Sequence, residues 1–372
     1  MHSYEQYKQR KNMTNLKKLG LSALASSLVA VSAQAGEIAV TGSANVTYKT
    51  GNATNGNTNK SIGSDKDVSF TGSGELDNGW TFTVSTLMDD AFAVSSSYTS
   101  MTMGSMGTIS FGTDTGGASY AYDEEVPQAY EQMSDAQQTT ANRVGTIHDS
   151  NMIVYNSPSF DLGGISASLD LEYSPGANSS GVNDGGSASL DNNFGSASGA
   201  GLTLSYDALK FGIYGAEIDR TTPGTNAQND VFEGAWYVNY SFGPVAIGYT
   251  ESYMDGGSEG SAESVDAAKD AATGNSRTAN GFFEGEQMSI AFNVNENFSV
   301  SYTESEETYD PQSHDGLATA PLDVTQKVEG IQAAYSMGAM SIKAYQIDVT
   351  NPAFDENAAD KTATEIALGL AF

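Results

Sequence analysis

The 372-residue sequence contains no cysteine, which excludes a disulfide scaffold, a thiolate metal site and a cysteine nucleophile. Basic residues are scarce, since 16 Lys and Arg residues stand against 46 Asp and Glu residues. The net charge of -30 argues against nucleic acid as a partner, because phosphates would be repelled, and favours cations. Proline occurs only 8 times, whereas Gly occurs 40 times and Tyr 19 times, a composition typical of a β-rich protein rather than a helical enzyme.

The amino terminus has the features of an export signal. Lys17 and Lys18 precede the apolar stretch LGLSALASSLVAV, and the small residues SAQA form a cleavage site that ends at Ala35. Residues 1–35 are therefore predicted to be a cleaved signal peptide. After them the chain contains no run of 18 apolar residues, so no transmembrane helix is predicted.

Residues 1–12 fit no part of a signal peptide, and we hypothesise that Met13 is the true start. Removing residues 1–35 takes away five basic residues and one acidic residue, which leaves 11 against 45 and a net charge near -34. Residues 36–372 are predicted to form a single domain. An exported protein without a transmembrane helix is either soluble or a β-barrel.

Several segments alternate large apolar residues with small or polar ones. The clearest are GWTFTVSTLM, GISASLDLEY, VFEGAWYVNY, QMSIAFNV and, at the carboxyl end, ATEIALGLAF. Successive side chains of a strand lie on opposite faces, so each segment predicts a strand with one apolar and one polar face. Because ionised groups such as Asp170 and Glu172 cannot face lipid or a dry core, the polar faces are predicted to point into a wet interior.

Short turns and long polar loops alternate along the chain. The tight turns are predicted near 77–78, 105–106, 158–160, 207–208, 241–243, 295–296 and 337–339, and the long loops at 51–65, 114–149, 174–198, 220–229, 255–282, 308–322 and 351–360. The segments between them amount to about sixteen strands, each of the ~9–11 residues that a tilted membrane strand needs.

The alternation of short turns with long loops predicts an all-β fold, a transmembrane antiparallel β-barrel with short turns at one end and long loops at the other. A closed barrel has no exposed edge, so the last strand should pair with the first, near 37–50. The structural alternative is a soluble barrel or sandwich, in which aromatic residues such as Trp80 and Trp236 would be core residues. Sixteen long strands fit a membrane barrel better.

The stretches GTISFGTDT and NMIVYNSPSFDLGGISASLDLEY, together with the aromatic carboxyl end, resemble the general porins of Gram-negative outer membranes, especially the α-proteobacterial type. The resemblance covers residues 36–372 and implies a sixteen-stranded trimeric barrel whose third loop, here 114–149, folds inward and narrows the pore. It also implies that the barrel-assembly machinery reads the last strand, at Ile366, Leu368, Leu370 and Phe372. Outer-membrane lipid and lipopolysaccharide are the implied surroundings, with trimer contacts expected near 37–50 and 95–112.

Acidic residues are concentrated in the segment that matches the inner loop. They are Asp123, Glu124, Glu125, Glu131 and Asp135. If this segment lies in the lumen, the carboxylates form a negative lining that favours cations over anions. The alternative is a solvated acidic loop on the outer surface.

Residues of inward parity are candidates for the pore wall, although each could lie instead at the polar rim beyond the membrane. They are Asp170, Glu172, Glu233 and Lys343, and Lys49 and Arg143 are further candidates for the pore wall. Many porins of this type place an arginine cluster opposite the acidic loop. The mature region has only three arginines, Arg143, Arg220 and Arg277, so an opposing cluster would come from lysines such as Lys49 and Lys343.

No catalytic or cofactor site is predicted. His148, Asp149 and Ser150 are residue types of a hydrolytic triad, but neighbours on a strand do not face each other as that mechanism requires. Acidic loops such as YMDGGSEGSAESVD and DPQSHDG could bind Ca²⁺ or Mg²⁺ weakly, without the spacing of an EF-hand.

The sequence therefore predicts an outer-membrane porin for passive diffusion of small hydrophilic solutes and ions, with a preference for cations. The alternatives are a substrate-selective channel, a secreted β-rich adhesin and an outer-membrane hydrolase.

Overall fold

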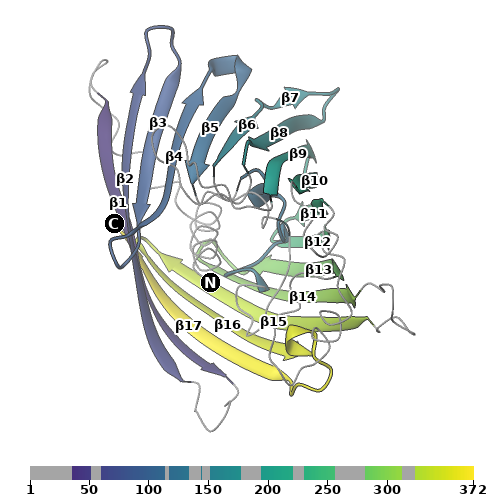
Figure 1. Ribbon diagram of the computed structural model, residues 1–372. Helices are drawn as coiled ribbons and strands as arrows, with labels where there is room; N and C mark the ends of the chain where they lie inside the picture. The colour runs from purple at the N-terminus through teal and green to yellow at the C-terminus, as the bar shows by residue number, and fades with distance from the viewer. Residues whose placement is uncertain are drawn as a thin grey trace.

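The computed structural model describes residues 36–51, 60–113, 117–133, 144, 151–176, 194–220, 230–255, 281–311 and 323–372. These residues form one antiparallel sheet that curves round into a ring (Figure 1). Its strands are β1 (Glu37–Gly51), β2 (Ser61–Glu75), β3 (Thr81–Met88), β4 (Val94–Thr102), β5 (Thr108–Thr113), β6 (Met152–Asn156), β7 (Phe160–Asp161), β8 (Ser166–Ser174), β9 (Phe194–Tyr206), β10 (Leu209–Arg220), β11 (Val231–Phe242), β12 (Val245–Asp255), β13 (Gly281–Asn293), β14 (Phe298–Pro311), β15 (Val324–Met337), β16 (Met340–Thr350) and β17 (Lys361–Ala371). Among the described residues, no helix is long and apolar enough to cross a membrane.

The seventeen strands occupy sixteen positions in the barrel, because β6 and β7 both pair with β8 and are two pieces of one strand. Pro158 lies in the break between them and has no N–H to donate. Ser157 keeps the two strands together, since its N–H donates to the Leu169 carbonyl at 2.8 Å and its Oγ accepts from the Leu169 N–H at 2.8 Å. The predicted turn at 158–160 is therefore wrong, and the strand continues past the proline.

The turn lies a few residues later, between Asp161 and Ile165. The Leu162 N–H donates to the Ile165 carbonyl at 2.7 Å, across Gly163 and Gly164 with φ of 73° and 99°. Two central residues with positive φ are what a tight hairpin turn requires, and glycine adopts them without strain. The other predicted tight turns fall between consecutive strands, within two residues of the expected positions.

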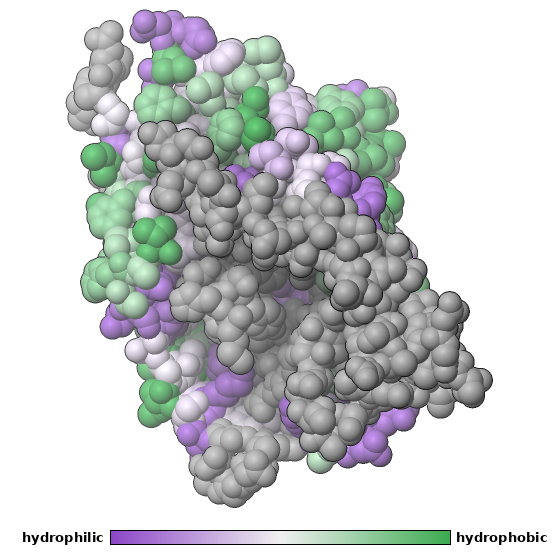
Figure 2. All heavy atoms as spheres, viewed as in Figure 1, coloured by the Kyte–Doolittle hydropathy of each residue, from purple (hydrophilic) through white to green (hydrophobic). Residues whose placement is uncertain are grey.

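The strands alternate in exposure as predicted, and β14 shows the pattern clearly. Ser301 and Thr303 are buried on the lumen side, whereas Tyr302 is exposed on the outer side. On β11, Glu233 is buried while Phe232 and Tyr240 are exposed. Figure 2 shows apolar residues, in green, gathered on the outer sides of the wall. An apolar outside and a polar inside are the reverse of a soluble barrel.

The barrel closes by pairing its last strand with its first, which confirms the prediction. The register of β17 against β1 runs from Ala371 opposite Ser43 to Ala363 opposite Gly51. Beyond the strand, Phe372 exchanges two backbone hydrogen bonds with Gly42, at 2.7 and 3.0 Å. A Cβ at position 42 would lie 2.5 Å from Phe372 Cζ, so the aromatic ring covers the bare backbone of this glycine.

We expect Gly42→Val to lower the free energy of unfolding by about 1–3 kcal/mol, because the added side chain overlaps the Phe372 ring. Gly72→Val is the matched control, since nothing lies within 4 Å of a Cβ there and valine favours strands. Urea unfolding of the refolded barrel, followed by tryptophan fluorescence, measures both. Equal destabilisation by the two substitutions would contradict the packing of Phe372 on Gly42.

Candidate functional site

Residues 117–133 fold into the barrel and lie against its inner wall. The backbone N–H of Ala118 donates to Glu172 Oε2 on β8 at 2.6 Å. At the other end of the segment, the Tyr130 hydroxyl donates to Glu365 Oε1 on β17 at 2.8 Å. The segment therefore spans the lumen side of the wall between β8 and β17, and we call it the inner loop.

Glu172 anchors the start of the inner loop. Its carboxylate is buried and accepts from the Ala118 N–H and from the Tyr214 hydroxyl on β10. Next to it, the Tyr122 hydroxyl donates to Asp170 Oδ2 at 2.6 Å, and the Tyr122 ring stacks on that of Tyr214 with centroids 5.4 Å apart. Asp170 and Glu172, predicted to face the interior, both do so.

Side chains from the strands in between hold the middle of the inner loop. Asn239 Nδ2 on β11 donates to the Glu125 carbonyl at 2.8 Å, and the Ala129 N–H donates to Ser301 Oγ on β14 at 2.9 Å. Lys210 Nζ on β10 lies 3.4 Å from Glu125 Oε1. The loop backbone is thus held by wall side chains at several points, so its path is set by the barrel.

The end of the inner loop is bound where the barrel closes. Glu365 accepts from Tyr130 on the loop and from the Tyr345 hydroxyl on β16, the latter at 3.2 Å. Lys49, paired opposite Glu365 in the β1–β17 register, has its Nζ 3.9 Å from Glu365 Oε2. Lys343 Nζ lies 5.1 Å from the centroid of the Tyr130 ring, within the range of a cation–π contact. We call these residues the seam cluster.

Burial raises the pKa of the Tyr130 phenol, and the carboxylates of Glu131 and Glu365 raise it further. The phenol is therefore protonated at neutral pH. A protonated phenol donates to a carboxylate, and this charge-assisted hydrogen bond is of the stronger kind.

Inward glycines make room for the inner loop. A Cβ at Gly201 would overlap the Tyr122 ring, one at Gly248 would overlap Pro127, and one at Gly330 would overlap the Met133 thioether. Each glycine lies on the lumen face of its strand, where other positions carry larger side chains. Glycine at inward parity is thus a sequence signal for the path of this loop, one that the search for charged residues missed.

The wall formed by β1–β5 is lined mainly by hydroxyl groups. Ser69, Thr71 and Ser85 lie within hydrogen-bond distance of one another, with oxygens 2.9–3.5 Å apart, and Thr102 pairs with Thr108 at 2.9 Å. The inward positions of β2–β6 include no lysine or arginine.

Lys49 and Lys343 face inward as predicted, but they do not form a cluster across the lumen from the loop. They lie on β1 and β16, the two neighbours of β17, and belong to the seam cluster. The alternation of residues in a strand shows whether a side chain faces the lumen, but it does not show where around the barrel the strand lies.

The predicted acidic residues of the inner loop differ in their surroundings. Asp123, Glu124 and Glu131 are buried, whereas Glu125 is half-buried and pairs with Lys210. Glu124 has a φ of 46°, a strained value for a residue other than glycine. On the wall, Glu233 is buried on the lumen face of β11. Asp135 and Arg143 lie outside the described residues.

Several residues of the site were not predicted, among them Tyr214, Asn239 and Ser301. Lys210, Tyr345 and Glu365, also not predicted, contact the inner loop or its partners, and all have inward parity in alternating segments. Parity would have placed them in the lumen, but only the folded barrel brings them to the loop.

The residues predicted as an assembly signal share the outer face of β17. Ile366, Leu368, Leu370 and Phe372 are all exposed there, while Ala363 and Ala367 are buried on the lumen side. The face is as predicted, and recognition by the assembly machinery stays a prediction.

A family model described as Gram-negative porin matches residues 20–370. Similar solved structures include Salmonella typhi OmpF in complex with daunomycin, at 10% identity over 91% of this chain and 98% of that chain, with a TM-score of 0.64. The outer membrane protein OmpT of Vibrio cholerae is 12% identical over 92% and 99% of the two chains, with a TM-score of 0.60. A search of curated proteins found no match.

An anion-selective porin from Comamonas acidovorans is also similar, at 12% identity over 91% of this chain and 100% of that chain, with a TM-score of 0.57. At such identities the likeness shows the fold alone, and the fold does not set the sign of ion selectivity. The family model matches most of the chain. The closed antiparallel barrel is the fold of outer-membrane channel proteins. The chain belongs to the Gram-negative porin family.

Proposed function

We propose that this porin lets small hydrophilic solutes and ions diffuse passively through its lumen, and that it favours cations. The observation that carries the proposal is the inner loop, which brings carboxylates into a barrel already lined by polar groups. A barrel of this strand number encloses an aqueous channel. The transport proposed requires no catalytic residue and no cofactor.

The charges of the lumen support the preference for cations. Among the described residues, the carboxylates on the loop and on inward strand positions include Asp65, Asp67, Asp123, Glu124, Glu125, Glu131, Asp170, Glu172, Glu233, Glu307 and Glu365. The described ammonium groups that face inward are fewer, at Lys49, Lys210, Lys343 and Lys361. An excess of fixed negative charge in a narrow polar channel raises the local concentration of cations and repels anions.

The remaining expectations are also proposals. Cleavage of residues 1–35, assembly as a homotrimer through β1 and the β4–β5 region, and contact with lipopolysaccharide follow from the export signal and the family. Ala44 on the outer face of β1 offers a small side chain that allows close approach of a neighbouring copy. No group of described residues is placed to hold a metal ion. The loops proposed to bind Ca²⁺ or Mg²⁺ weakly lie largely outside the described residues.

Single-channel recording in a planar bilayer under a salt gradient tests the proposal. We expect stable current steps in threes, with a reversal potential of the sign that cation preference gives. A current that saturates with rising concentration of one solute would indicate a substrate-selective channel. A folded barrel that gives no steps would contradict the porin function and favour the adhesin or the hydrolase.

Neutralising the loop carboxylates together, with Glu124→Gln, Glu125→Gln and Glu131→Gln, should move the reversal potential toward zero. The substitutions remove three negative charges from the inner loop, and one of them, that of Glu125, is the partner of Lys210. The matched control is Glu217→Gln, Asp219→Asn and Asp348→Asn, which removes the same charge from exposed outer positions. At ~1 M salt the screening length is ~3 Å, so the outer charges should leave selectivity unchanged. An equal shift in both triple variants would contradict the role of the loop.

Removing the loop hydroxyl at the seam cluster, with Tyr130→Phe, should make the open-channel current noisier and lower the voltage at which the channel closes. The ring remains, but Glu365 loses its donor at 2.8 Å, an interaction worth about 1.5–3 kcal/mol. Tyr155→Phe is the control, because its hydroxyl donates to the Met106 carbonyl at 2.9 Å, away from the inner loop. Unchanged noise and closing voltage in Tyr130→Phe would show that this contact does not hold the loop.

A further inference from the structure

The outer face of β12–β15 carries carboxylates in rows that run across the strands. Residues directly opposite one another in the register make up each row. One row is Glu251, Glu286, Glu306 and Lys327, and the next is Tyr249, Met288, Glu304 and Glu329. The next row on the same face, beyond that of Tyr249, is apolar, with Ile247, Ile290 and Tyr302 directly opposite one another. Acidic groups thus stand directly beside the apolar part of the outer wall.

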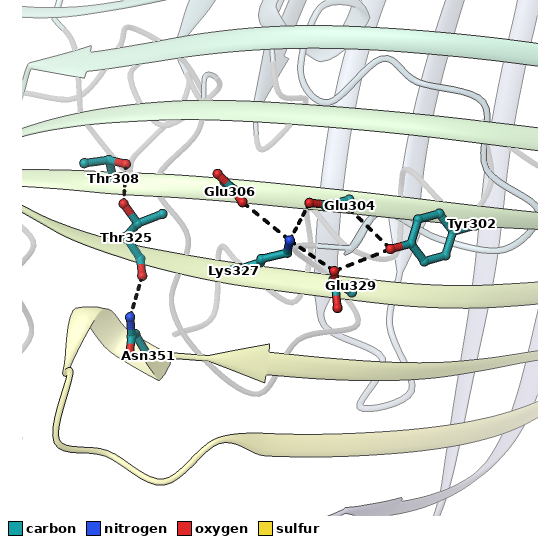
Figure 3. A network of polar contacts seen from close by, with 8 residues as sticks. All are labelled: Tyr302, Glu304, Glu306, Thr308, Thr325, Lys327, Glu329 and Asn351. Carbon is teal, nitrogen blue, oxygen red and sulfur yellow. Dashed lines mark hydrogen bonds and ion pairs between the residues drawn. The ribbon is translucent and has the colours of Figure 1, made fainter.

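On the β14–β15 half of these rows, one ammonium group contacts three carboxylates (Figure 3). Lys327 Nζ contacts Glu304 and lies 3.1 Å from Glu329 Oε1 and 3.6 Å from Glu306 Oε1. The Tyr302 hydroxyl borders the group, 3.4 Å from Glu304 Oε2. This half shows how an alkyl chain that ends in an ammonium group fits between the carboxylates of this surface.

The β12–β13 half has a similar set of carboxylates and, among the residues that the structure describes, no such cation. Glu251 lies directly opposite Glu286, and Glu284 follows on the same face of β13. Like charges directly opposite each other in a sheet are destabilising. Trp236 Nε1 donates to Glu251 at 2.9 Å and the Tyr249 hydroxyl donates at 2.6 Å, but neither donor carries charge. The outward positions of β10–β13 include no lysine or arginine.

An apolar groove of about 400 Å³ lies next to this half, on the outer surface of β11–β14. Its walls include Val238, Tyr240, Ile247, Met288, Ile290 and Tyr302. Tyr249 and Glu304 also line it, so the groove reaches the rows of carboxylates. Its shape and chemistry fit a hydrocarbon chain that ends beside Glu251 and Glu286.

We infer that the groove binds an amphiphile with an alkylammonium head group, whose chain fills the groove and whose charge lies between Glu251 and Glu286. The ammonium group would occupy on β12–β13 the position that Lys327 occupies on β14–β15. A phosphate head group would be repelled, and no group of described residues is placed to hold a bridging metal ion. The site lies on the outer face of the barrel and is independent of conduction through the lumen.

Tryptophan fluorescence tests this inference, because Trp236 lies beside the site and the chain has only one other tryptophan, Trp80. Trp80→Phe leaves Trp236 as the single reporter. The refolded full chain is placed in phosphatidylcholine vesicles that contain a dibrominated alkylamine, alcohol or phosphate of the same chain length. Bromine quenches a tryptophan that it contacts, so the ratio of quenching between these three amphiphiles reports the preference for the head group.

We expect the alkylamine to bind about three- to tenfold more tightly than the alcohol, as for one or two partly exposed ion pairs. Adding Glu251→Gln and Glu286→Gln should abolish the preference, while Glu217→Gln and Asp219→Asn should preserve it. Equal quenching by amine and alcohol would overturn the inference. So would a preference that survives Glu251→Gln and Glu286→Gln, or a preference for the phosphate when Mg²⁺ is present.

Discussion

The hydrogen-bonding demand of the backbone in a bilayer is the constraint on which this structure depends. Hydrocarbon offers no partner for a free N–H or carbonyl, so a sheet within it must close on itself. The pairing of β17 with β1 meets this demand from Ser43 to Gly51, and Phe372 extends it by one more residue, at Gly42. Closure also brings Lys49 beside Glu365, and so creates the seam cluster that receives the inner loop.

Closure turns the polar faces of the strands into a lumen, and the inner loop depends on that polarity. Carboxylates, amides and hydroxyls of the wall bind the loop backbone and its tyrosines, as Glu172, Asn239 and Ser301 show. Inward glycines such as Gly201 leave the space that the loop fills. The loop is therefore held by the wall on the β8–β17 side, while the β1–β5 side is lined mainly by hydroxyl groups.

The alternation of apolar and polar residues predicted which face of its strand each residue occupies, because this depends only on the geometry of a single strand. Alternation assigned Leu368 and Leu370 to the outer face and Glu172 to the lumen, because the two-residue period of a strand needs no knowledge of its neighbours. The break at Pro158 was predicted as a turn, since the hydrogen bonds between Ser157 and Leu169 that carry the strand past it cannot be seen in the sequence.

The partners of the inner loop were beyond prediction for a different reason. Tyr130 and Glu365 are 235 residues apart in the chain, and only the closed barrel brings them together. Likewise, parity placed Lys343 in the lumen but gave no position around the ring. The carboxylates of the loop were found as a cluster, yet their burial, as at Glu131, depends on the wall that the loop meets.

The central claim, that the acidic segment lies inside the barrel against the wall, can be tested directly because the chain has no cysteine of its own. Ala129→Cys combined with Ser301→Cys puts one thiol on the inner loop and one on β14, at two residues joined by a hydrogen bond of 2.9 Å from the backbone N–H of 129 to Oγ of 301. A disulfide that forms in the folded barrel, identified by mass spectrometry of the tryptic digest, is the predicted result. Two free thiols, with the one at 129 labelled by a bulky reagent too large to enter the lumen, would place the segment on the outer surface and contradict the account.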